Sequence, residues 1–587
     1  MHSNTITPWE RPHSATHAAL VVGELQELIF PQLLAFEHDG RPYKVQKDLT
    51  NLAVTCRAFL EVALNIRWRN ISFGQLIQVW EARGVLVQAD MSWGGREMEF
   101  ARTPTYEDWQ RFEYYARRIR CMRLESLPAT TQFSSAFANA VSNGSRQSRF
   151  QVKESPVLPI FPRLKSLEWK FGPGTSEVRV VTAVISESPA LDSLAIFASP
   201  ERDELPSDSW VAFFSSLDNH GRPLKSLKIL ARIHGSGASY DMEAKIPSLV
   251  QLIRRSALQE LILPSDAIGA EAIAIAISYI PTLKVLEVSD QYSVFEVYEA
   301  APVPHNAFSS LECLRGDVIT VVSLLIIPTF PSLAKLMIQG PSGEANVAWP
   351  FIRRAIGAIG QNCPALEVLH LRVGLFFKDF EDVGGSETGR TGPTSAFASL
   401  RGCPRLKDVL FDLSGTWFDG FHRDEINLLD EQWEHIAEAW PDLTSVWFGT
   451  GVSYEGHGLA SSVPRPRATL RTIASFFRHC PKLSSFGVAI SARGEEARSA
   501  LGEISPKQGP TRLDLRGSWI IEDAQDVAIF LASQLPHQDS EIQIPQSQLE
   551  YNRGTPEQAL EVARREDLQR IRQLVGSART TRHTLGL

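Results

Sequence analysis

The stretch "CPALEVLHLRV", residues 363–373, contains the pattern that decides the fold of this chain. Leu366, Leu369 and Leu371 follow a Cys-Pro pair in the order LxxLxL. Near-copies are "CPRLKDVLFDL" from Cys403, "WPDLTSVWFGT" from Trp440 and "CPKLSSFGVAI" from Cys480. A pattern that recurs at intervals of about 20 to 50 residues indicates a repeat architecture. Further copies are therefore expected elsewhere in the chain.

The copies share a leucine at the first position, with large apolar residues three and five positions later. These first leucines are Leu164, Leu191, Leu224, Leu258, Leu283, Leu333, Leu366, Leu406, Leu443 and Leu483. Most have a proline two residues earlier, which ends a helix and favours extended backbone beside it. A degenerate copy at Leu311 fails at Gly316, and 119–124 and 513–515 are candidate outer copies. The xLxL part alternates between two faces, as a short strand does.

Helical patterns separate these predicted strands. They occupy 246–256, 349–362, 430–440 and 468–480, where apolar residues recur with the period of an amphipathic helix. A single unit of helix, proline stop and strand cannot bury its own apolar face, whereas stacked units can. An all-helical solenoid with accidental LxxLxL matches is the alternative.

This repeat resembles the leucine-rich repeat, although the Asn or Cys usual near the end of each copy is mostly absent. The resemblance implies an α/β fold in which parallel strands line a concave face and helices lie outside. The spacing varies, from 27 residues between Leu164 and Leu191 to 40 between Leu366 and Leu406, so we expect an irregular solenoid. We predict a disordered N-terminus at 1–17, a helical module at 18–73 and a connector at 74–104. The solenoid is predicted at 105–535, and a C-terminal tail with a charged helix at 536–587.

The composition excludes several classes of protein. The chain has 587 residues, 43% of them hydrophobic, and a net charge of −8, which gives no electrostatic case for nucleic acid or an anionic membrane. No signal peptide or apolar run of membrane-spanning length is present, so we expect a cytoplasmic or nuclear location. The six cysteines form no CxxC pair, and His435, His457 and His479 have no regular ligand spacing. We therefore predict no metal, no cofactor and no enzymatic activity.

The helical module at 18–73 resembles an F-box. The resemblance rests on "VVGELQELIF" (21–30), "VTCRAF" (54–59) and "IRWRNISF" (66–73). The helix that follows, "YEDWQRFEYYARRIRCMRLES" (106–126), is similar to the Asp-Trp-x-Arg-Phe helix that enters the first repeat of fungal F-box proteins. An N-terminal cap of the solenoid is the alternative interpretation of these helices.

The resemblance implies a substrate receptor of an SCF-type cullin–RING ubiquitin ligase, which contacts a Skp-type adaptor and through it a cullin. The residues that it implies for adaptor binding, some of which must instead stabilise the module, are Leu25, Leu28, Ile29, Phe30, Leu52, Cys56, Phe59 and Trp68. A repeat-based scaffold with a decayed F-box remains the alternative function. Val22 and Gln26, which replace a proline and a leucine of the motif, favour it.

A protein substrate would bind at the central x of LxxLxL, because that position points away from the core. Met337, His370, Leu410 and Trp447 occupy it and form a predicted apolar stripe. The flanking predicted substrate-binding residues are Lys335, Arg372, Asp408 and Asp412. Two insertions rich in Gly, Ser and Pro, 374–395 and 449–468, follow these strands and are candidate recognition loops. Irregular repeats that turn these side chains elsewhere are the alternative.

Overall fold

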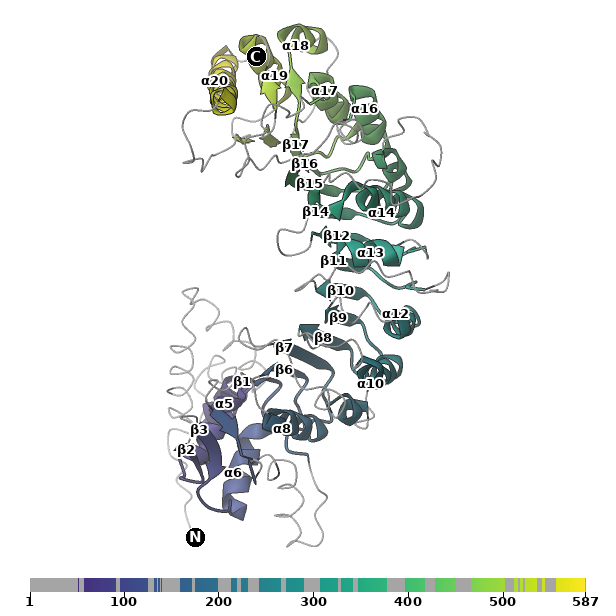
Figure 1. Ribbon diagram of the computed structural model, residues 1–587. Coiled ribbons are helices and arrows are strands. Elements are labelled where there is room, and N and C mark those ends of the chain that lie inside the picture. The colour runs from purple at the N-terminus through teal and green to yellow at the C-terminus, as the bar shows by residue number, and fades with distance from the viewer. Residues whose placement is uncertain are drawn as a thin grey trace, which may run out of the picture. The chain divides into compact units, whose positions relative to one another are not determined.

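The computed structural model describes two compact units of the chain. The described residues are 51, 57–90, 96–124, 131–134, 136, 137, 139, 159–171, 175–198, 213–218, 223–230, 242–264, 271–289, 307–325, 329–340, 347–376, 396–416, 428–449, 466–501, 511–515, 518–520, 523–535, 541–543 and 556–585. The units are Met1–Leu258 and Gln259–Leu587. Figure 1 labels their helices and strands. Within the described residues, no helix has both the length and the apolar character that a bilayer span needs.

Unit 1 contains a parallel sheet and a small second sheet. The strands of the parallel sheet, in spatial order, are β1 (Asn70–Ser72), β4 (Cys121–Leu124), β6 (Ser166–Phe171), β7 (Ser193–Ala198) and β8 (Ser226–Leu230). The second sheet contains β2 (Leu86–Asp90), β3 (Arg96–Phe100) and β5 (Thr131–Phe133). The helices are α4 (Arg57–Arg67), α5 (Phe73–Glu81), α6 (Tyr106–Ala116), α8 (Thr175–Ser186) and α10 (Met242–Arg255).

Unit 2 repeats the same plan over a longer parallel sheet. Its strands, in spatial order, are β9 (Glu260–Pro264), β10 (Val285–Ser289), β11 (Cys313–Asp317), β12 (Lys335–Gln339), β14 (Val368–Phe376), β15 (Asp408–Thr416), β16 (Ser445–Gly449), β17 (Ser485–Val488), β19 (Arg512–Asp514) and β21 (Glu541–Gln543). Short parallel pairs add β13 (Val347–Ala348) beside β14, and β18 (Ser491–Ala492) beside β20 (Trp519–Ile520). The structure therefore has the parallel-strand α/β solenoid fold that the sequence predicts.

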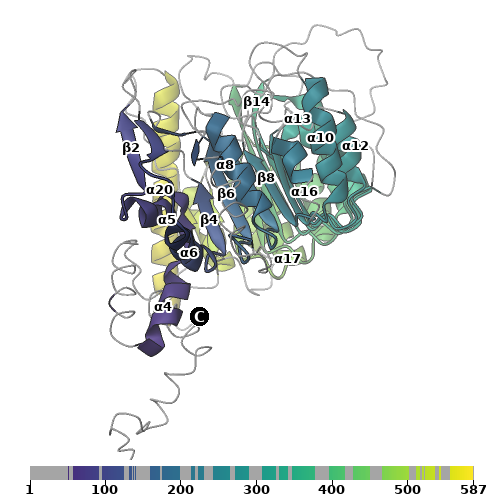
Figure 2. The same cartoon turned by 90° about the horizontal axis from the view of Figure 1, so that it is seen from below.

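Helices cover one face of the unit 2 sheet. They are α12 (Glu271–Ser278), α13 (Val318–Leu325), α14 (Trp349–Asn362), the 3-10 helix η3 (Ala396–Gly402), α16 (Asp430–Ala439), α17 (Leu470–His479), α18 (Gly494–Leu501) and α19 (Ala524–Gln534). The last helix, α20 (Pro556–Leu585), packs on α19 instead. Figure 2 shows α12, α13 and α16 on the same side of the strands. We call the opposite side, with Met337 and His370, the open face. The four predicted helical segments coincide with α10, α14, α16 and α17.

The proline of each copy lies in a tight turn between helix and strand. In the opening stretch, the N–H of Leu366 donates to the carbonyl of Cys363 at 3.2 Å, so Pro364 occupies the second position of a β-turn. Its fixed φ suits that position. The N–H of Val368 then donates to the carbonyl of Ala334 in the preceding repeat at 2.9 Å, which starts the parallel ladder. The proline thus ends one element and begins the next.

The repeated leucines form the core. Every first leucine of the ten copies is at most 4% exposed, and the apolar residues three and five positions later are buried as well. Burial of a leucine side chain contributes about 1.5–3 kcal/mol, so these rows account for much of the stability of each unit. The candidate outer copies form β4 and β19, as predicted.

The expectation that the copy at Leu311 fails at Gly316 was wrong. This copy forms β11, which pairs in register with β10 and β12. A Cβ at Gly316 would lie 2.9 Å from the Cβ of Val288, so the neighbouring valine fills the space that a larger residue occupies in other copies. This copy of the repeat is complete because a side chain of the preceding strand, β10, fills the space beside Gly316.

In three copies, the side chain of the residue before the proline donates a hydrogen bond to the preceding repeat. The Cys403 thiol donates to the carbonyl of Ile359 at 3.6 Å, and the Cys480 thiol donates to that of Ala437 at 3.5 Å. Trp440 Nε1 donates to the carbonyl of Leu400 at 3.3 Å from the same position. Each of these carbonyls also accepts a backbone N–H from its own repeat, so the side chain supplies a second donor that ties consecutive repeats together. Burial raises the pKa of the Cys403 and Cys480 thiols to about 12, so these cysteines are buried structural residues.

An aromatic cluster and a buried carboxylate hold the start of unit 1. The Trp80 ring stacks on Phe112 with centroids 4.3 Å apart and meets Trp109 edge-on at 4.9 Å. Asp108, whose side chain is fully buried, accepts from Thr105 N at 2.9 Å and Thr105 Oγ1 at 2.8 Å. It also accepts from Arg83 Nε at 2.8 Å and Arg102 Nη1 at 2.7 Å. The Asp-Trp-x-Arg-Phe signature therefore encodes a helix cap and a core.

The predicted C-terminal charged helix is α20. It packs on α19, and Leu568, Ile571 and Val575 are at most 1% exposed. These three residues lie on one side of the helix because they are spaced by three and four positions. The segment from Leu568 to Val575 is therefore docked on α19.

Candidate functional site

The predicted substrate-binding residues lie together on the open face of unit 2. Strand register places Met337 beside His370, His370 beside Leu410 and Leu410 beside Trp447. Side chains alternate along a strand, and the residues on either side of each member point into the leucine core. All four are half-buried. We call this set the central row.

The four charged residues flank the central row on the same face. Lys335 and Asp408 lie two positions before central-row residues, and Arg372 and Asp412 lie two positions after them. Arg372 is exposed, and the other three are half-buried. The structure thus brings all eight predicted residues to one surface. Whether they bind a substrate stays a prediction.

The Trp447 indole lies on two glycines. A Cβ at Gly449 would lie 2.0 Å from Trp447 Cη2, and one at Gly487 would lie 2.4 Å from Cδ1. The absence of side chains at both positions therefore makes room for the ring. Trp447 Nε1 donates to Asp514 Oδ2 at 3.1 Å, across the strand that carries Gly487. The ring is fixed at one end and has a defined orientation on the sheet.

Polar contacts continue along the central row. His370 Nε2 lies 2.9 Å from Asp408 Oδ2, and Arg315 Nε donates to the Met337 sulfur at 3.1 Å. Arg315 also lies 3.5 Å from Glu287, its neighbour on β10. Each contact crosses between adjacent strands, so it fixes the orientation of a side chain without adding to the core. The row therefore presents apolar atoms in set positions with polar groups around them.

Other residues of the same strand position differ from this pattern. Ile262, in unit 2, is only 7% exposed and belongs to the core. In unit 1, Glu168 pairs with Arg123 at 3.1 Å, and Ala195 lies between Glu168 and Lys228 in register. The apolar stripe is thus confined to β12 through β16. The two predicted recognition loops lie outside the described residues, except for the strand ends to Phe376 and Gly449 and for 466–468.

Two of the eight predicted adaptor-binding residues, Phe59 and Trp68, belong to the part of the chain that the structure describes. Leu25, Leu28, Ile29, Phe30, Leu52 and Cys56 lie outside the described residues. Phe59 is half-buried on α4. Trp68 is 9% exposed and stacks on Tyr115 of α6, with centroids 4.4 Å apart. This packing favours a structural role for Trp68, which is the alternative left open by the sequence.

The second half of the helical module is joined firmly to the repeats. Arg118, just beyond α6, forms an ion pair with Glu61 of α4, and its guanidinium lies 3.9 Å from the centre of the Tyr114 ring. Strand β1, inside the range predicted for the module, pairs with β4 of the parallel sheet. Any partner bound to α4 would therefore be held in a fixed position relative to the sheet of unit 1.

Comparison with known proteins gives no sequence relative. No protein-family model matches the chain, and no curated protein matches it. The solved structures that resemble parts of it include the following two. A Rad7–Elc1 complex from yeast shows 12% identity over 79% of this chain and 93% of the other, with a TM-score of 0.30. The leucine-rich-repeat protein LegL7 from Legionella pneumophila shows 13% identity over 55% and 88%, with a TM-score of 0.26. The fold assignment rests on the strand register and buried leucines described above.

Proposed function

We propose that this chain is the substrate-recognition subunit of an SCF-type cullin–RING ubiquitin ligase, acting in the cytoplasm, the nucleus or both. The helical module would dock a Skp-type adaptor, which links it to a cullin, and unit 2 would bind a protein substrate. Such a subunit catalyses nothing itself. It raises the effective concentration of a substrate lysine near a charged ubiquitin-conjugating enzyme.

The open face of unit 2 is the observation that carries substrate binding. Met337, Leu410 and Trp447 expose apolar atoms in register on one sheet, with His370 between Met337 and Leu410. Apolar groups gathered on a solvated surface usually mark a protein-binding site, and tryptophan is a frequent hot-spot residue. The charged rim of Arg372 and Asp412 would provide specificity.

The resemblance to the F-box supports adaptor binding. The "VTCRAF" segment ends at Phe59, which is half-buried on α4. The contacts of Glu61 and Trp68 with α6 fix this helix to unit 1. A receptor that works by positioning needs such a rigid connection, because a loose one would lower the effective concentration at the substrate lysine.

The first test measures binding of the full chain to a purified Skp-type adaptor by biolayer interferometry. We expect Leu25→Ala/Phe59→Ala to weaken binding by about 100-fold, from two interface residues each worth about 1–2 kcal/mol. Tyr279→Ala, at a 64% exposed residue of unit 2, is the matched control and should bind like wild type. A folded wild-type chain that does not bind would refute the receptor assignment. The repeat-based scaffold, favoured by Val22 and Gln26, would then be the better account.

The second test separates substrate binding from adaptor binding. Proteins captured by the wild type but not by Trp447→Ala would be tested for ubiquitylation in a reconstituted ligase. We expect modification to require Trp447 while adaptor affinity stays unchanged. A substrate that is modified equally well with the variant would show that the open face at Trp447 is not the recognition surface.

A further inference from the structure

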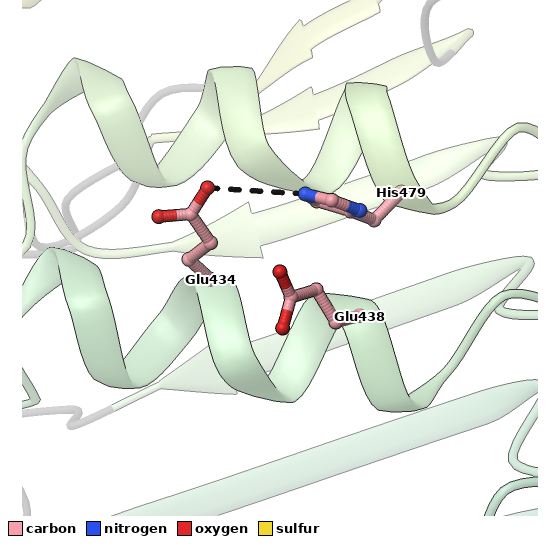
Figure 3. A group of neighbouring side chains, drawn as sticks. All are labelled: Glu434, Glu438 and His479. Atoms are coloured by element: carbon pink, nitrogen blue, oxygen red, sulfur yellow. Dashed lines mark ion pairs between the residues drawn. The ribbon is translucent and has the colours of Figure 1, made fainter.

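Three potential metal ligands converge on the helical side of unit 2, away from the open face. Glu434 and Glu438 come from α16, and His479 is the last residue of α17. One ligand atom from each lies within 4.8 Å of the other two. Figure 3 shows both carboxylates and the imidazole ring directed toward the space between the two helices.

The helices that carry these side chains are held in place. Glu434 and Glu438 are four residues apart, so their side chains project from the same face of α16. At the opposite end of the pair, Asp430 accepts from Thr469 N at 2.7 Å and from Thr472 Oγ1 at 2.6 Å. This carboxylate fixes the start of α17 on the start of α16. The three ligands therefore have defined backbone positions before any ion arrives.

His479 supplies an independent indication of a ligand. Its Nε2 atom is shielded from solvent and has no hydrogen-bond partner among the described residues. The Glu434 carboxylate oxygen is 3.8 Å away, which is too far for a hydrogen bond. A shielded ring nitrogen without a partner is costly, and a metal ion would satisfy it. The Glu434 and His479 side chains remain 39% and 26% exposed, so an ion has access from solvent.

We propose that Glu434, Glu438 and His479 bind a divalent transition-metal ion, with Zn²⁺ the best fit. One oxygen from each glutamate and His479 Nε2 would provide three ligands, and water would complete a tetrahedral shell. An imidazole with two carboxylates favours Zn²⁺ and similar ions over Mg²⁺ and Ca²⁺, which prefer oxygen ligands alone. Bonds of about 2.0–2.2 Å require the three atoms to approach by about 1 Å, which the flexible glutamate side chains permit.

Arg478 competes with the ion for Glu434. Its Nη1 lies 3.5 Å from Glu434 Oε1, so the guanidinium holds this carboxylate when no metal is bound. Metal binding has to displace that contact. The bound ion would join α16 to α17 and thus link two consecutive repeats, independently of any ubiquitin-ligase role. Because the ion binds the folded pair, it would also raise the stability of this part of unit 2.

The test titrates the chelator-treated full chain with Zn²⁺ by calorimetry and with Co²⁺ by visible absorption. We expect one saturable site whose Co²⁺ spectrum is that of a tetrahedral nitrogen and oxygen site. Glu434→Gln, Glu438→Gln and His479→Asn should each weaken Zn²⁺ binding at least about 10-fold, whereas Arg478→Gln should tighten it. His435→Asn is the matched control: this exposed residue lies on α16 beside Glu434, and the variant should bind Zn²⁺ like wild type.

Circular dichroism of each variant checks folding. The proposal is overturned if the wild type shows no saturable binding, or if His479→Asn binds Zn²⁺ as well as wild type does. The proposal is also overturned if His479 only forms an ion pair with Glu434 and binds no metal. In that case, His479→Asn would change the pH dependence of stability while Zn²⁺ left the unfolding temperature of the wild type unchanged.

Discussion

The buried carboxylate of Asp108 allows a quantitative prediction about unit 1. Asp108→Asn keeps the shape of the side chain but removes the charge that faces Arg83 and Arg102 at 2.8 and 2.7 Å. Breaking a buried ion pair costs about 3–5 kcal/mol. The two arginine side chains are 34% and 41% exposed, so water recovers part of that cost. We therefore expect a loss of about 3 kcal/mol.

Hydrogen exchange followed by mass spectrometry on the peptide that contains α6 measures this loss locally. A change of about 3 kcal/mol corresponds to amide exchange that is about 100-fold faster, if exchange reports the local opening equilibrium. Glu107→Gln is the matched control, because it removes an exposed carboxylate from the same helical turn. It should cost at most about 0.5 kcal/mol through the helix dipole.

The same carboxylate has a defined pH dependence. The hydrogen bond from Arg102 holds the pKa of Asp108 well below its usual range in the folded chain. The folded state therefore binds fewer protons than the unfolded state, whose aspartate pKa is about 3.9. The stabilisation is present above about pH 4 and is lost as the pH falls further. Equal protection in Asp108→Asn and Glu107→Gln, or an unchanged acid sensitivity in Asp108→Asn, would refute this reasoning.

Three further predictions concern unit 2 and the cysteines. Gly360→Ala should lower the free energy of unfolding by about 1–3 kcal/mol in urea titrations, because its Cβ would lie 2.0 Å from the carbonyl oxygen of Ser399; a Gly357→Ala control, which has open space, should not. Gly487→Ala should move the Trp447 ring off the sheet and away from Asp514, which a crystal structure would reveal. An unmoved ring would contradict the conclusion that the missing side chain of Gly487 makes room for the ring. Cys403 and Cys480 should resist a thiol reagent in the native chain at pH 8 while exposed Cys121 reacts, because burial raises their pKa to about 12; labelling of all three at equal rates would contradict this.

The repeat architecture was predictable because its information is local. A proline, a turn and three apolar residues lie within one short stretch, so each copy of the repeat could be recognised on its own. The central row followed from the same pattern, since alternation along a strand fixes which side chain faces outward. The copy with Gly316 was misjudged because the side chain that completes it, Val288, belongs to the previous strand.

The features that the sequence did not reveal depend on contacts between repeats. Trp447 and Asp514 are separated by 67 residues, and only the strand register brings them together. His479 looked like an isolated histidine near a helix end, because Glu434 and Glu438 belong to the preceding repeat. Uneven repeat lengths make such pairings hard to deduce, since the offset between equivalent positions changes from copy to copy. The role of Trp68, in adaptor binding or in stabilising the module, was also left open by the sequence, because its partner Tyr115 lies on α6, far along the chain.

The alternation along each strand has an evolutionary consequence. Leu336, Leu369 and Val409 determine whether the chain folds, while Met337, His370 and Leu410 beside them contribute little to the core. Mutations can therefore accumulate at the second set with little loss of stability. Duplicated genes encoding such a chain could diverge toward different targets while retaining one architecture. Selection on what is recognised and selection on what keeps the chain folded would then act on separate residues.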